Sequence, residues 1–406
     1  LVRHLILPPN NDSTNIKKYL QIIYMKYCFD KYYIREECCM CKSGELELLL
    51  ENDLESQLSL NLYDYKNKNP FIPYNILSCK KCNTAQNKYL GNLELVYEKN
   101  HQDSFSKTKT DKHNLFKSFI LDNKNIYSII EAGASNGILA DNIINESKIT
   151  YTIIEPNVDK KLDNRINAID DYLENIDISK INSNCLVMSD MFEHFYEPLK
   201  ILEKIKNSNI DYIILNHPNF DHAVKNKHCI ILNIEHTFLI ENNFLFKLMN
   251  NYGFKLNRKV EYLNFSLFLE FKKVNNNDTL KLFNVNTKKD LVNYINEMKN
   301  ISTYINNYME NNSKQDFYIW PCSVHSCTLF LFGLNYKKLK GILDNSPNKI
   351  GKFIDGYNLY CNSFNELLNT KNENITVFIS GANAYIDELK LNNNINIIKI
   401  NKILIK

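Results

Sequence analysis

The sequence predicts a multidomain α/β protein, and three observations support this fold class. The chain has 406 residues, more than one ordinary hydrophobic core organises, so two or three domains are expected. Strand-like and helix-like segments alternate over residues 111–275 and again beyond residue 287, which implies parallel sheets covered by helices on both faces. Residues 38–97 instead contain short alternating segments, turns and cysteine pairs, which indicates a separate small module.

The elements follow from apolar periodicity and turn residues. Helices are predicted at 14–27, 111–121 and 287–312, and an amphipathic helix over 239–253 ends at Gly253, a suitable residue beyond a helix C-terminus. The Asn-rich segment 274–279 is the best linker candidate, and the predicted domains are residues 1–100, 101–275 and 276–406. Strands are predicted at 126–131, 150–155, 183–189 and 210–215, as a hairpin over 254–274, and at 316–320, 339–344, 375–380 and 395–401.

Composition indicates a folded chain with no strongly charged partner. Hydrophobic residues make up 44% of the sequence and aromatic residues 12%, enough for a buried interior. The formal net charge is only +3, so neither a nucleic acid polymer nor an anionic membrane is expected as a partner. No apolar run approaches the roughly 18 residues that cross a bilayer, and residues 1–9 lack a long apolar leader region. We therefore expect a cytoplasmic enzyme that is a monomer or a homodimer.

Two CxxC pairs, Cys38 with Cys41 and Cys79 with Cys82, predict a metal site. They are separated by 37 residues, and four thiolates from two such turns can close tetrahedrally on Zn²⁺. A closed set of four thiolates leaves no open position for catalysis, so the predicted zinc is structural. Cys39 is a possible substitute for Cys38 within the first pair.

Other interpretations of the cysteines remain open. In a chain without a secretory signal the cysteines can simply stay reduced and bind no metal. Redox chemistry of the thioredoxin type is less favoured, because neither pair opens a helix within a βαβ pattern. Turn residues accompany both pairs: Gly44 follows the first, and Asn83 follows the second.

The segment "YSIIEAGASNGILADNII" predicts a strand, a small-residue turn and a helix. Gly133 and Gly137 let the backbone turn tightly and approach a ligand. The turn also matches G-x-S-x-G, the nucleophile elbow of hydrolases, but Glu131 two residues earlier has no evident use in acyl transfer. It lacks the third-glycine spacing of the dinucleotide fingerprint.

A second acidic residue favours S-adenosylmethionine (SAM) as the cofactor. Glu155 ends the next predicted strand, 18 residues after Gly137, where a carboxylate meets two ribose hydroxyls. In such a site Glu131 would face the amino-acid end of SAM. The predicted cofactor set is completed by Ser135, Asn136, Pro156, Asp170 and Ser189.

Four features occur in one order along the chain: the paired cysteines, "EAGASNG" with "IEPN", "SDMFEHF", and "NIEHTF". In this order the sequence resembles the sugar C-methyltransferases that act on nucleotide-linked 3-keto-deoxysugars. The resemblance covers residues 38–400, including "WPCSVHSCTLFLFG" and "GILDNSPNKIGKFIDGYNL" near the C-terminus. It implies a small N-terminal zinc module, a class I methyltransferase core with a Rossmann-like fold, and a C-terminal Rossmann-like domain that helps to hold a nucleotide-sugar.

Methyl transfer to carbon needs an aligned acceptor and a base. Carbon becomes nucleophilic when a base removes a proton next to a carbonyl, and the enolate oxygen then needs hydrogen-bond donors. His194 follows the strand predicted at 183–189, and His236 follows the one at 210–215 after a long loop, at the end of the sheet where ligands bind. The resemblance makes His236 the base, His194 a second polar group near the keto-sugar, and Glu235 a residue that positions substrate.

Two departures from the family's pattern affect the predicted sugar pocket. Asn233 replaces the tyrosine that the family has three residues before the base. Tyr97 and His101 stand where the family has a tyrosine-rich segment before the core. All three are expected to contact substrate, and the changes leave methylation of an oxygen atom open as an alternative.

Other roles for the histidines are also open. His194 could be an ordinary residue at a helix N-terminus, and His236 could be a structural histidine. His217, His222 or His228, from the intervening loop, could replace either one. A catalytic metal on those loop histidines has no recognisable ligand spacing.

In the predicted C-terminal domain, Ser323 and His325 follow a strand and open a helix. Free N–H groups at a helix N-terminus can bind a diphosphate, which makes these two residues candidate substrate-binding groups. Ser323 could instead be only an N-cap, and Asp344 is expected to form an Asx-type turn.

The sequence therefore predicts a zinc-containing, SAM-dependent methyltransferase whose substrate is a nucleotide-sugar. One alternative is a sugar or glycan O-methyltransferase of the same architecture. A second, from another class, is a zinc- and nucleotide-binding scaffold without transfer activity.

Overall fold

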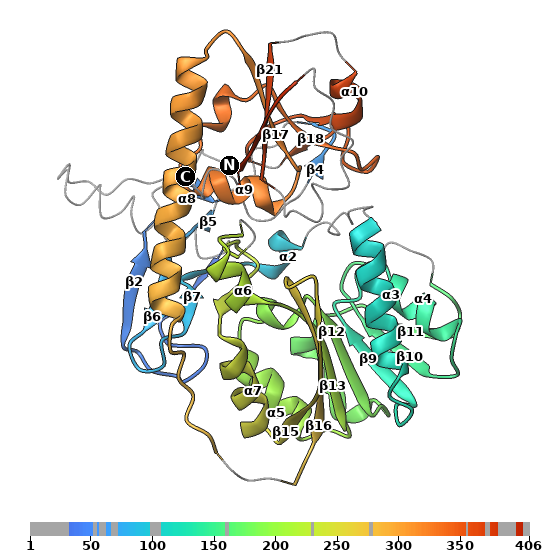
Figure 1. Ribbon diagram of the computed structural model, residues 1–406. Helices are drawn as coiled ribbons and strands as arrows, with labels where there is room; N and C mark the ends of the chain where they lie inside the picture. The colour runs from blue at the N-terminus through green and yellow to red at the C-terminus, as the bar shows by residue number, and fades with distance from the viewer. Residues whose placement is uncertain are drawn as a thin grey trace, which may run out of the picture.

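A computed structural model describes most of the chain (Figure 1). Three predictions fall outside the described residues: the helix at 14–27, His101, and the middle of the linker at 274–279. The described residues are 32–51, 55–56, 62–65, 72–97, 107–158, 162–228, 231–275, 279–354, 356–369, 374–380 and 395–400.

A seven-stranded sheet forms the centre of the middle domain. Its strands lie in the order β11-β10-β9-β12-β13-β16-β15, all parallel up to β13, with β16 antiparallel to both of its neighbours. Counted along the chain this order is 3-2-1-4-5-7-6 with the seventh strand reversed, the topology of the class I methyltransferase fold, so the predicted fold class is confirmed. The strands are β9 (Ser128–Ala132), β10 (Thr150–Ile154), β11 (Ile166–Ile169), β12 (Cys185–Ser189), β13 (Tyr212–Pro218), β15 (Phe254–Tyr262) and β16 (Ser266–Lys273).

Helices cover both faces of this sheet, because alternate strand residues are apolar on each side. α3 (Lys107–Leu121) and α4 (Ile138–Ile144) pack on one face, and α5 (Pro198–Lys206) and α7 (Asn242–Asn251) pack on the other (Figure 1). Gly253, at φ +84°, follows α7 as predicted. The remaining helical segments of this domain are α6 (Phe220–Lys225) and the short 3₁₀ helices η1 (Leu173–Asn175), η2 (Ile178–Lys180) and η3 (Phe192–His194).

The N-terminal module contains a four-stranded antiparallel sheet that takes one strand from the middle domain. The order is β14-β7-β6-β2, and β14 (Phe238–Leu239) begins two residues after His236. The module therefore holds the chain directly after this histidine. The module's own elements, including the three strands that it contributes to this sheet, are β1 (Tyr32–Ile34), β2 (Leu46–Leu50), β3 (Glu55–Ser56), β4 (Leu62–Tyr63), β5 (Ile72–Pro73), β6 (Ile76–Cys79), β7 (Ala85–Asn87), β8 (Tyr89–Gly91) and α2 (Leu93–Val96).

The C-terminal domain follows α8 (Thr287–Asn311) and contains a five-stranded parallel sheet. The order β20-β18-β17-β21-β22 is 3-2-1-4-5 along the domain, which is the Rossmann-like arrangement that the resemblance implies. Its elements are β17 (Asp316–Trp320), α9 (Val324–Leu331), η4 (Tyr336–Lys338), β18 (Gly341–Asp344), β19 (Phe353–Ile354), β20 (Cys361–Ser363), α10 (Phe364–Leu368), β21 (Ile375–Ile379) and β22 (Asn396–Lys399).

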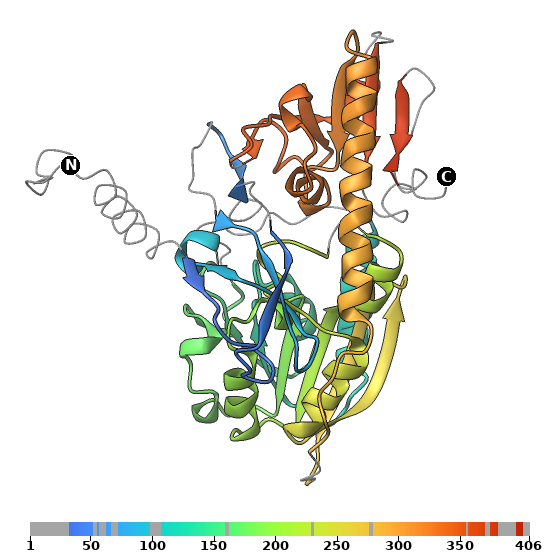
Figure 2. The same cartoon turned by 90° about the vertical axis from the view of Figure 1, so that its left-hand side faces the viewer.

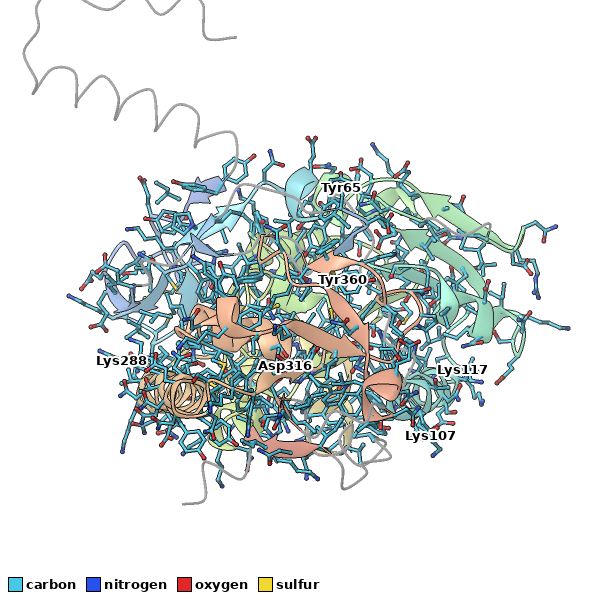
Figure 3. All side chains as sticks on the ribbon, turned by 90° about the horizontal axis from the view of Figure 1, so that it is seen from above. Tyr65, Lys107, Lys117, Lys288, Asp316 and Tyr360 are labelled. Atoms are coloured by element: carbon cyan, nitrogen blue, oxygen red, sulfur yellow. The ribbon has the colours of Figure 1, made fainter. Side chains whose placement is uncertain are left out.

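The long helix α8 runs along the side of the molecule beside both the N-terminal module and the C-terminal domain (Figures 1 and 2). Lys288, the second residue of α8, places its Nζ 2.6 Å from Oε1 of Glu47 in β2 (Figure 3). Lys227, just after α6, places its Nζ 2.9 Å from Oε1 of Glu297 in α8. Within the described ranges, no helix has the length and apolarity that crossing a bilayer requires.

The segment between β13 and β14 lies where the three units meet. Ile231 and Leu232 belong to one apolar core that also contains Tyr74 of the N-terminal module, Leu291 of α8 and Leu329 of α9. This packing fixes the loop that ends at His236, so the candidate base lies at a three-way junction.

Candidate active site and metal centre

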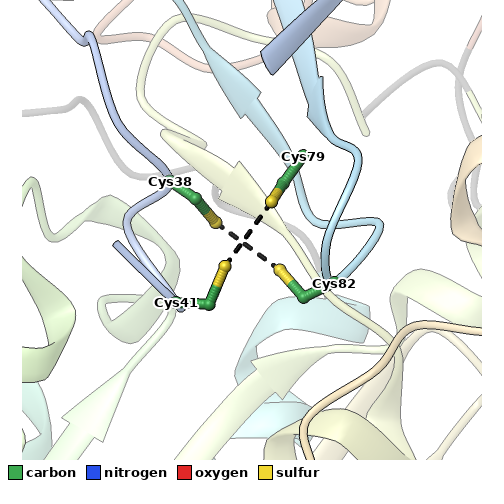
Figure 4. Close-up of side chains that lie close together, drawn as sticks. All are labelled: Cys38, Cys41, Cys79 and Cys82. Atoms are coloured by element: carbon green, nitrogen blue, oxygen red, sulfur yellow. Dashed lines mark hydrogen bonds between the residues drawn. The ribbon is translucent and has the colours of Figure 1, made fainter. Parts of the chain in front are cut away.

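The four paired cysteines come together at one point in the N-terminal module. The Sγ atoms of Cys38 and Cys82 are 3.5 Å apart, as are those of Cys41 and Cys79, and all four lie within 4.8 Å of one another (Figure 4). Four sulfurs at about 2.3 Å from one Zn²⁺ would have separations of this size, so the donor set and its spacing fit a tetrahedral zinc site. These are the predicted metal ligands.

Each cysteine pair forms the same kind of turn. In the first, the Lys42 N–H donates to the Cys38 carbonyl at 2.9 Å, and in the second the Asn83 N–H donates to the Cys79 carbonyl at 2.8 Å. Lys42 and Asn83 both adopt positive φ, near +58° and +56°. Asn83 is the expected turn residue, but in the first pair Lys42 takes the left-handed position and Gly44 does not. The completely buried Cys39 lies outside the four-sulfur group.

The glycine turn after β9 is held against the end of β10. Gly133 and Gly137 have φ of +73° and +72°, values that glycine adopts without strain. A Cβ on Gly137 would lie 2.7 Å from Cδ2 of Leu162. The Ser135 N–H donates to Oε2 of Glu155 at 2.9 Å, and Asn136 accepts from the Ile138 N–H at 3.3 Å within the turn.

A pocket of about 550 Å³ opens at the ends of β10 and β11. Three predicted cofactor residues, Glu155, Pro156 and Asp170, line it together with Asn157 and Leu162. The carboxylate of Glu155 also accepts the Asn157 N–H at 3.1 Å. This is the edge of the sheet where ligands of open α/β folds bind.

Glu131 lies beneath the glycine turn and outside the residues that line the pocket. Its side chain is 2% exposed and accepts a hydrogen bond from the Tyr151 hydroxyl at 2.9 Å. Burial raises the pKa of Glu131 to about 7, despite the hydrogen bond from Tyr151, which lowers it. The carboxyl group is therefore poised between its neutral and charged forms at neutral pH.

Ser189 belongs to a polar network at the end of β12. Its hydroxyl accepts from Nδ2 of Asn216 at 2.9 Å, and the same amide donates to Asp190 at 3.1 Å. Lys112 of α3, nearly buried, places its Nζ 2.8 Å from Asp190. Sequence reasoning missed Lys112, because a lysine in a polar helix gives no sign that it is buried.

His236 is fixed in orientation by one contact at its main-chain N–H and another at its ring. Its N–H donates to Oδ1 of Asn233 at 2.9 Å, and Nδ1 lies 3.0 Å from the Ile231 carbonyl. A carbonyl only accepts, so Nδ1 carries the proton and Nε2 carries the free lone pair. Burial lowers the pKa of His236, against the raising effect of Glu193. Asn233 also accepts the Glu235 N–H at 2.8 Å, so its side-chain oxygen shapes this turn.

His194, the last residue of η3, faces His236 with the ring centroids 5.5 Å apart. Its Nδ1 lies 3.1 Å from the Tyr97 hydroxyl, so the structure brings together three of the predicted residues. The Tyr97 carbonyl in turn accepts from Nδ2 of Asn157 at 2.5 Å. Because Asn157 lines the pocket beside Glu155, hydrogen bonds through Tyr97 and Asn157 connect the histidine pair to the pocket.

Glu193 is the residue of this site that sequence reasoning did not single out. It is completely buried, and Nδ1 of His217 and Nε2 of His236 lie 3.3 and 4.0 Å from its two carboxylate oxygens. Burial opposes its ionisation, but His217, His194 and His236 together lower the pKa of Glu193 to about 2. In the sequence, the one feature that could have pointed to Glu193 was its position directly before His194. Ligand atoms of Glu193, His194 and His236 lie within 4.8 Å of one another, so this group could also hold a metal ion.

In the C-terminal domain, Ser323 is the N-cap of α9. Its hydroxyl accepts the His325 N–H at 3.3 Å and lies 3.1 Å from the ring Nδ1 of the same residue. Burial lowers the pKa of His325 to about 4, and His228 acts in the same direction. Asp344 accepts the backbone N–H groups of the next two residues, as expected for an Asx-type turn.

No protein-family model and no curated protein sequence matches the chain. Among solved structures, it is similar to the plantazolicin methyltransferase BpumL, with 12% identity over 41% of this chain and 85% of that chain and a TM-score of 0.34. It is also similar to the N-methyltransferase NodS from Bradyrhizobium japonicum WM9, with 8% identity over 42% of this chain and 98% of that chain and a TM-score of 0.32. A third is a SAM-dependent methyltransferase from Aquifex aeolicus, with 13% identity over 42% of this chain and 100% of that chain and a TM-score of 0.32.

Proposed function

We propose that the chain is a SAM-dependent methyltransferase that methylates the carbon next to the keto group of a nucleotide-linked keto-deoxysugar. His236 is the general base, and the four paired cysteines hold a structural zinc. The observation that carries this proposal is the link from the Glu155 pocket through Asn157 and Tyr97 to the facing rings of His194 and His236.

The pocket supports a site for the adenosine end of SAM. Glu155 offers carboxylate oxygens for the two ribose hydroxyls, and Asp170 lies on the same wall. The turn at Gly133 to Gly137 lies next to this pocket, and Ser189 ends the neighbouring strand β12. We assign these residues to the cofactor. When bound, SAM supplies an electrophilic methyl group on a sulfonium.

The histidine pair supports proton removal from carbon. Nε2 of His236 is free to accept, and the lowered pKa keeps the ring neutral at neutral pH, as a general base requires. The base takes the α-proton, and the C–H electron pair moves into an enolate. His194 and the Tyr97 hydroxyl lie across from the base and can donate to the enolate oxygen. Glu235 and Asn233 adjoin the base and are assigned to substrate contacts.

The C-terminal domain is assigned to the nucleotide part of the substrate. Ser323 and His325 lie at the start of α9, and His325 adjoins His228 of the loop that leads to His236. Thr328 of α9 donates to the Leu232 carbonyl at 3.3 Å, which ties this helix to the same loop. A diphosphate at α9 would therefore lie on the side of the molecule that carries the base.

Deuterium exchange tests the role of the base. The protein is incubated with a nucleotide-linked 3-keto-deoxysugar and S-adenosylhomocysteine in D₂O, and mass spectrometry measures label at the carbon next to the keto group. We expect exchange with the wild type and with His222→Ala, and none with His236→Ala. Exchange that persists in His236→Ala removes His236 from the role. Methyl transfer without any exchange would favour oxygen methylation, and absence of cofactor binding would favour a scaffold.

A further inference from the structure

Glu193 is a buried carboxylate enclosed by histidines. It is completely buried, and ring nitrogens of His217 and His236 lie 3.3 and 4.0 Å from its two carboxylate oxygens, as ion-pair contacts outside the geometry of a hydrogen bond. An isolated buried charge costs several kcal/mol, so the carboxylate must be compensated by a nearby cation. The neighbours that favour its ionised form are His217, His194 and His236.

The backbone holds Glu193 at a fixed place relative to His236. The Thr237 N–H donates to the Glu193 carbonyl at 3.0 Å, and the Thr237 hydroxyl donates to the Phe195 carbonyl at 2.6 Å. The Thr237 carbonyl accepts from the buried guanidinium of Arg35 at 2.7 Å. Thr237, next to His236, is thus hydrogen-bonded to the backbone of Glu193 and of Phe195, which fixes the position of Glu193 relative to His236.

The two carboxylate oxygens face different histidines. Oε2 lies 3.3 Å from Nδ1 of His217, and Oε1 lies 4.0 Å from Nε2 of His236. Nε2 is the atom that would take the substrate proton in the proposed function. Oε1 therefore places a negative charge 4.0 Å from the atom where positive charge develops.

We infer that Glu193 is a positioning residue that stabilises the protonated imidazole of His236, with His217 holding the carboxylate in place. The inference rests on the proposed function of His236. During the reaction the proton leaves the substrate carbon for Nε2 of His236, and the neutral ring becomes a cation that pairs with Glu193. A buried cation without this partner would be costly, so the pairing lowers the barrier to proton removal.

Glu193, His194 and His236 could instead hold a divalent metal ion, and the distances favour the ion pair. Two ligands at about 2.1 Å from one tetrahedral metal ion lie roughly 3.4 Å apart, less than the 4.0 Å between Nε2 of His236 and Oε1 of Glu193. His217 also occupies the second carboxylate oxygen. The titratable groups that face this cluster are His194, Glu235 and Tyr97 around the two histidines and Asp221 next to His217.

The test measures the titration of His236 in the full chain without substrate. Imidazole-labelled protein is titrated by NMR, and the His236 signal is assigned as the one missing in His236→Ala. In Glu193→Gln, which keeps the shape and removes the charge, we expect the His236 midpoint to move to lower pH. Glu193→Asp is expected to restore part of the shift, and the control Glu203→Gln, on the exposed side of α5, is expected to change nothing. An unchanged midpoint in Glu193→Gln overturns the inference.

Two further measurements separate this inference from others. Deuterium exchange is expected to slow more than about tenfold in Glu193→Gln, with unchanged affinity for S-adenosylhomocysteine. Metal analysis is expected to find one zinc per chain in both the wild type and Glu193→Gln, and a second metal lost in the variant would overturn the ion pair in favour of a metal site. Failure of the proposed function gives a different result, namely exchange that persists in His236→Ala. If Glu193→Gln does not fold, His217→Gln is titrated in the same way; a shifted His236 midpoint is expected, and an unchanged midpoint overturns the inference.

Discussion

Replacing Glu155 by alanine tests the cofactor pocket most sharply. The carboxylate accepts the Ser135 N–H at 2.9 Å and the Asn157 N–H at 3.1 Å, and it lines the 550 Å³ pocket. Alanine removes the acceptors for the ribose hydroxyls and also frees the glycine turn. A hydrogen bond to a charged group contributes about 1.5–3 kcal/mol, so losing two of them should weaken binding by about 3 kcal/mol or more. That corresponds to a loss of affinity of at least about 100-fold.

The assay is isothermal calorimetry with S-adenosylhomocysteine at 25 °C. Glu155→Gln keeps the shape and one acceptor oxygen, so its affinity should fall between those of the wild type and Glu155→Ala. Glu146→Gln is the matched control, because Glu146 pairs with Lys117 on the surface. If Glu155→Ala binds within about twofold of the wild type while remaining folded, the assignment of this pocket to the cofactor is wrong.

Three further predictions follow from the described contacts. Cys79→Ser should lose zinc, as measured by metal analysis, and should lose methyl transfer more than cofactor affinity, because β6, which ends at Cys79, belongs to the sheet that contains the strand after His236, and no residue of that sheet lines the pocket. Burial raises the pKa of Glu131 from 4.5 to about 7, so the stability linked to this residue is present below pH 4.5 and is lost as pH rises to 7. Glu131→Gln should therefore raise the free energy of unfolding at pH 8 by about 3 kcal/mol, measured by urea denaturation, and no gain would contradict the buried environment. Lys349→Met should lower the free energy of unfolding by about 3–5 kcal/mol, because it leaves Asp344 without the ammonium 2.9 Å away. A variant of unchanged thermal stability would show that this ion pair contributes nothing.

The sequence was sufficient to predict where most strands of the core sheet lie, because apolar periodicity and turn residues depend directly on local structure. The strands that carry Glu131 and Ser189, and the strand that ends just before Glu155, lie within a few residues of their predicted positions. β11 and β20 were missed. β11 has two exposed residues among its four, and β20 has only three residues, so neither shows a usable apolar pattern.

The site was only partly predictable, because its decisive contacts are long-range. The spacing of the cysteine pairs predicted that these four thiols meet, but the left-handed position of Lys42 depends on the closed turn and not on residue type. Glu193 and His217 lie 24 residues apart in the chain, and nothing local indicates that they meet in a buried pair. The pairing of β14 with β7 joins residues about 150 positions apart, so the support of the His236 segment by the zinc module could not be read from the sequence.

Carbon methylation that depends on His236 is the central claim, and one measurement tests it most directly. The protein is incubated with a nucleotide-linked 3-keto-deoxysugar and SAM carrying a ¹³C methyl group, and the product is examined by two-dimensional NMR. We predict a labelled methyl group bonded to the ring carbon next to the keto group with the wild type, and no product with His236→Ala. A labelled methyl group on oxygen, or the same carbon product with His236→Ala, would contradict the account.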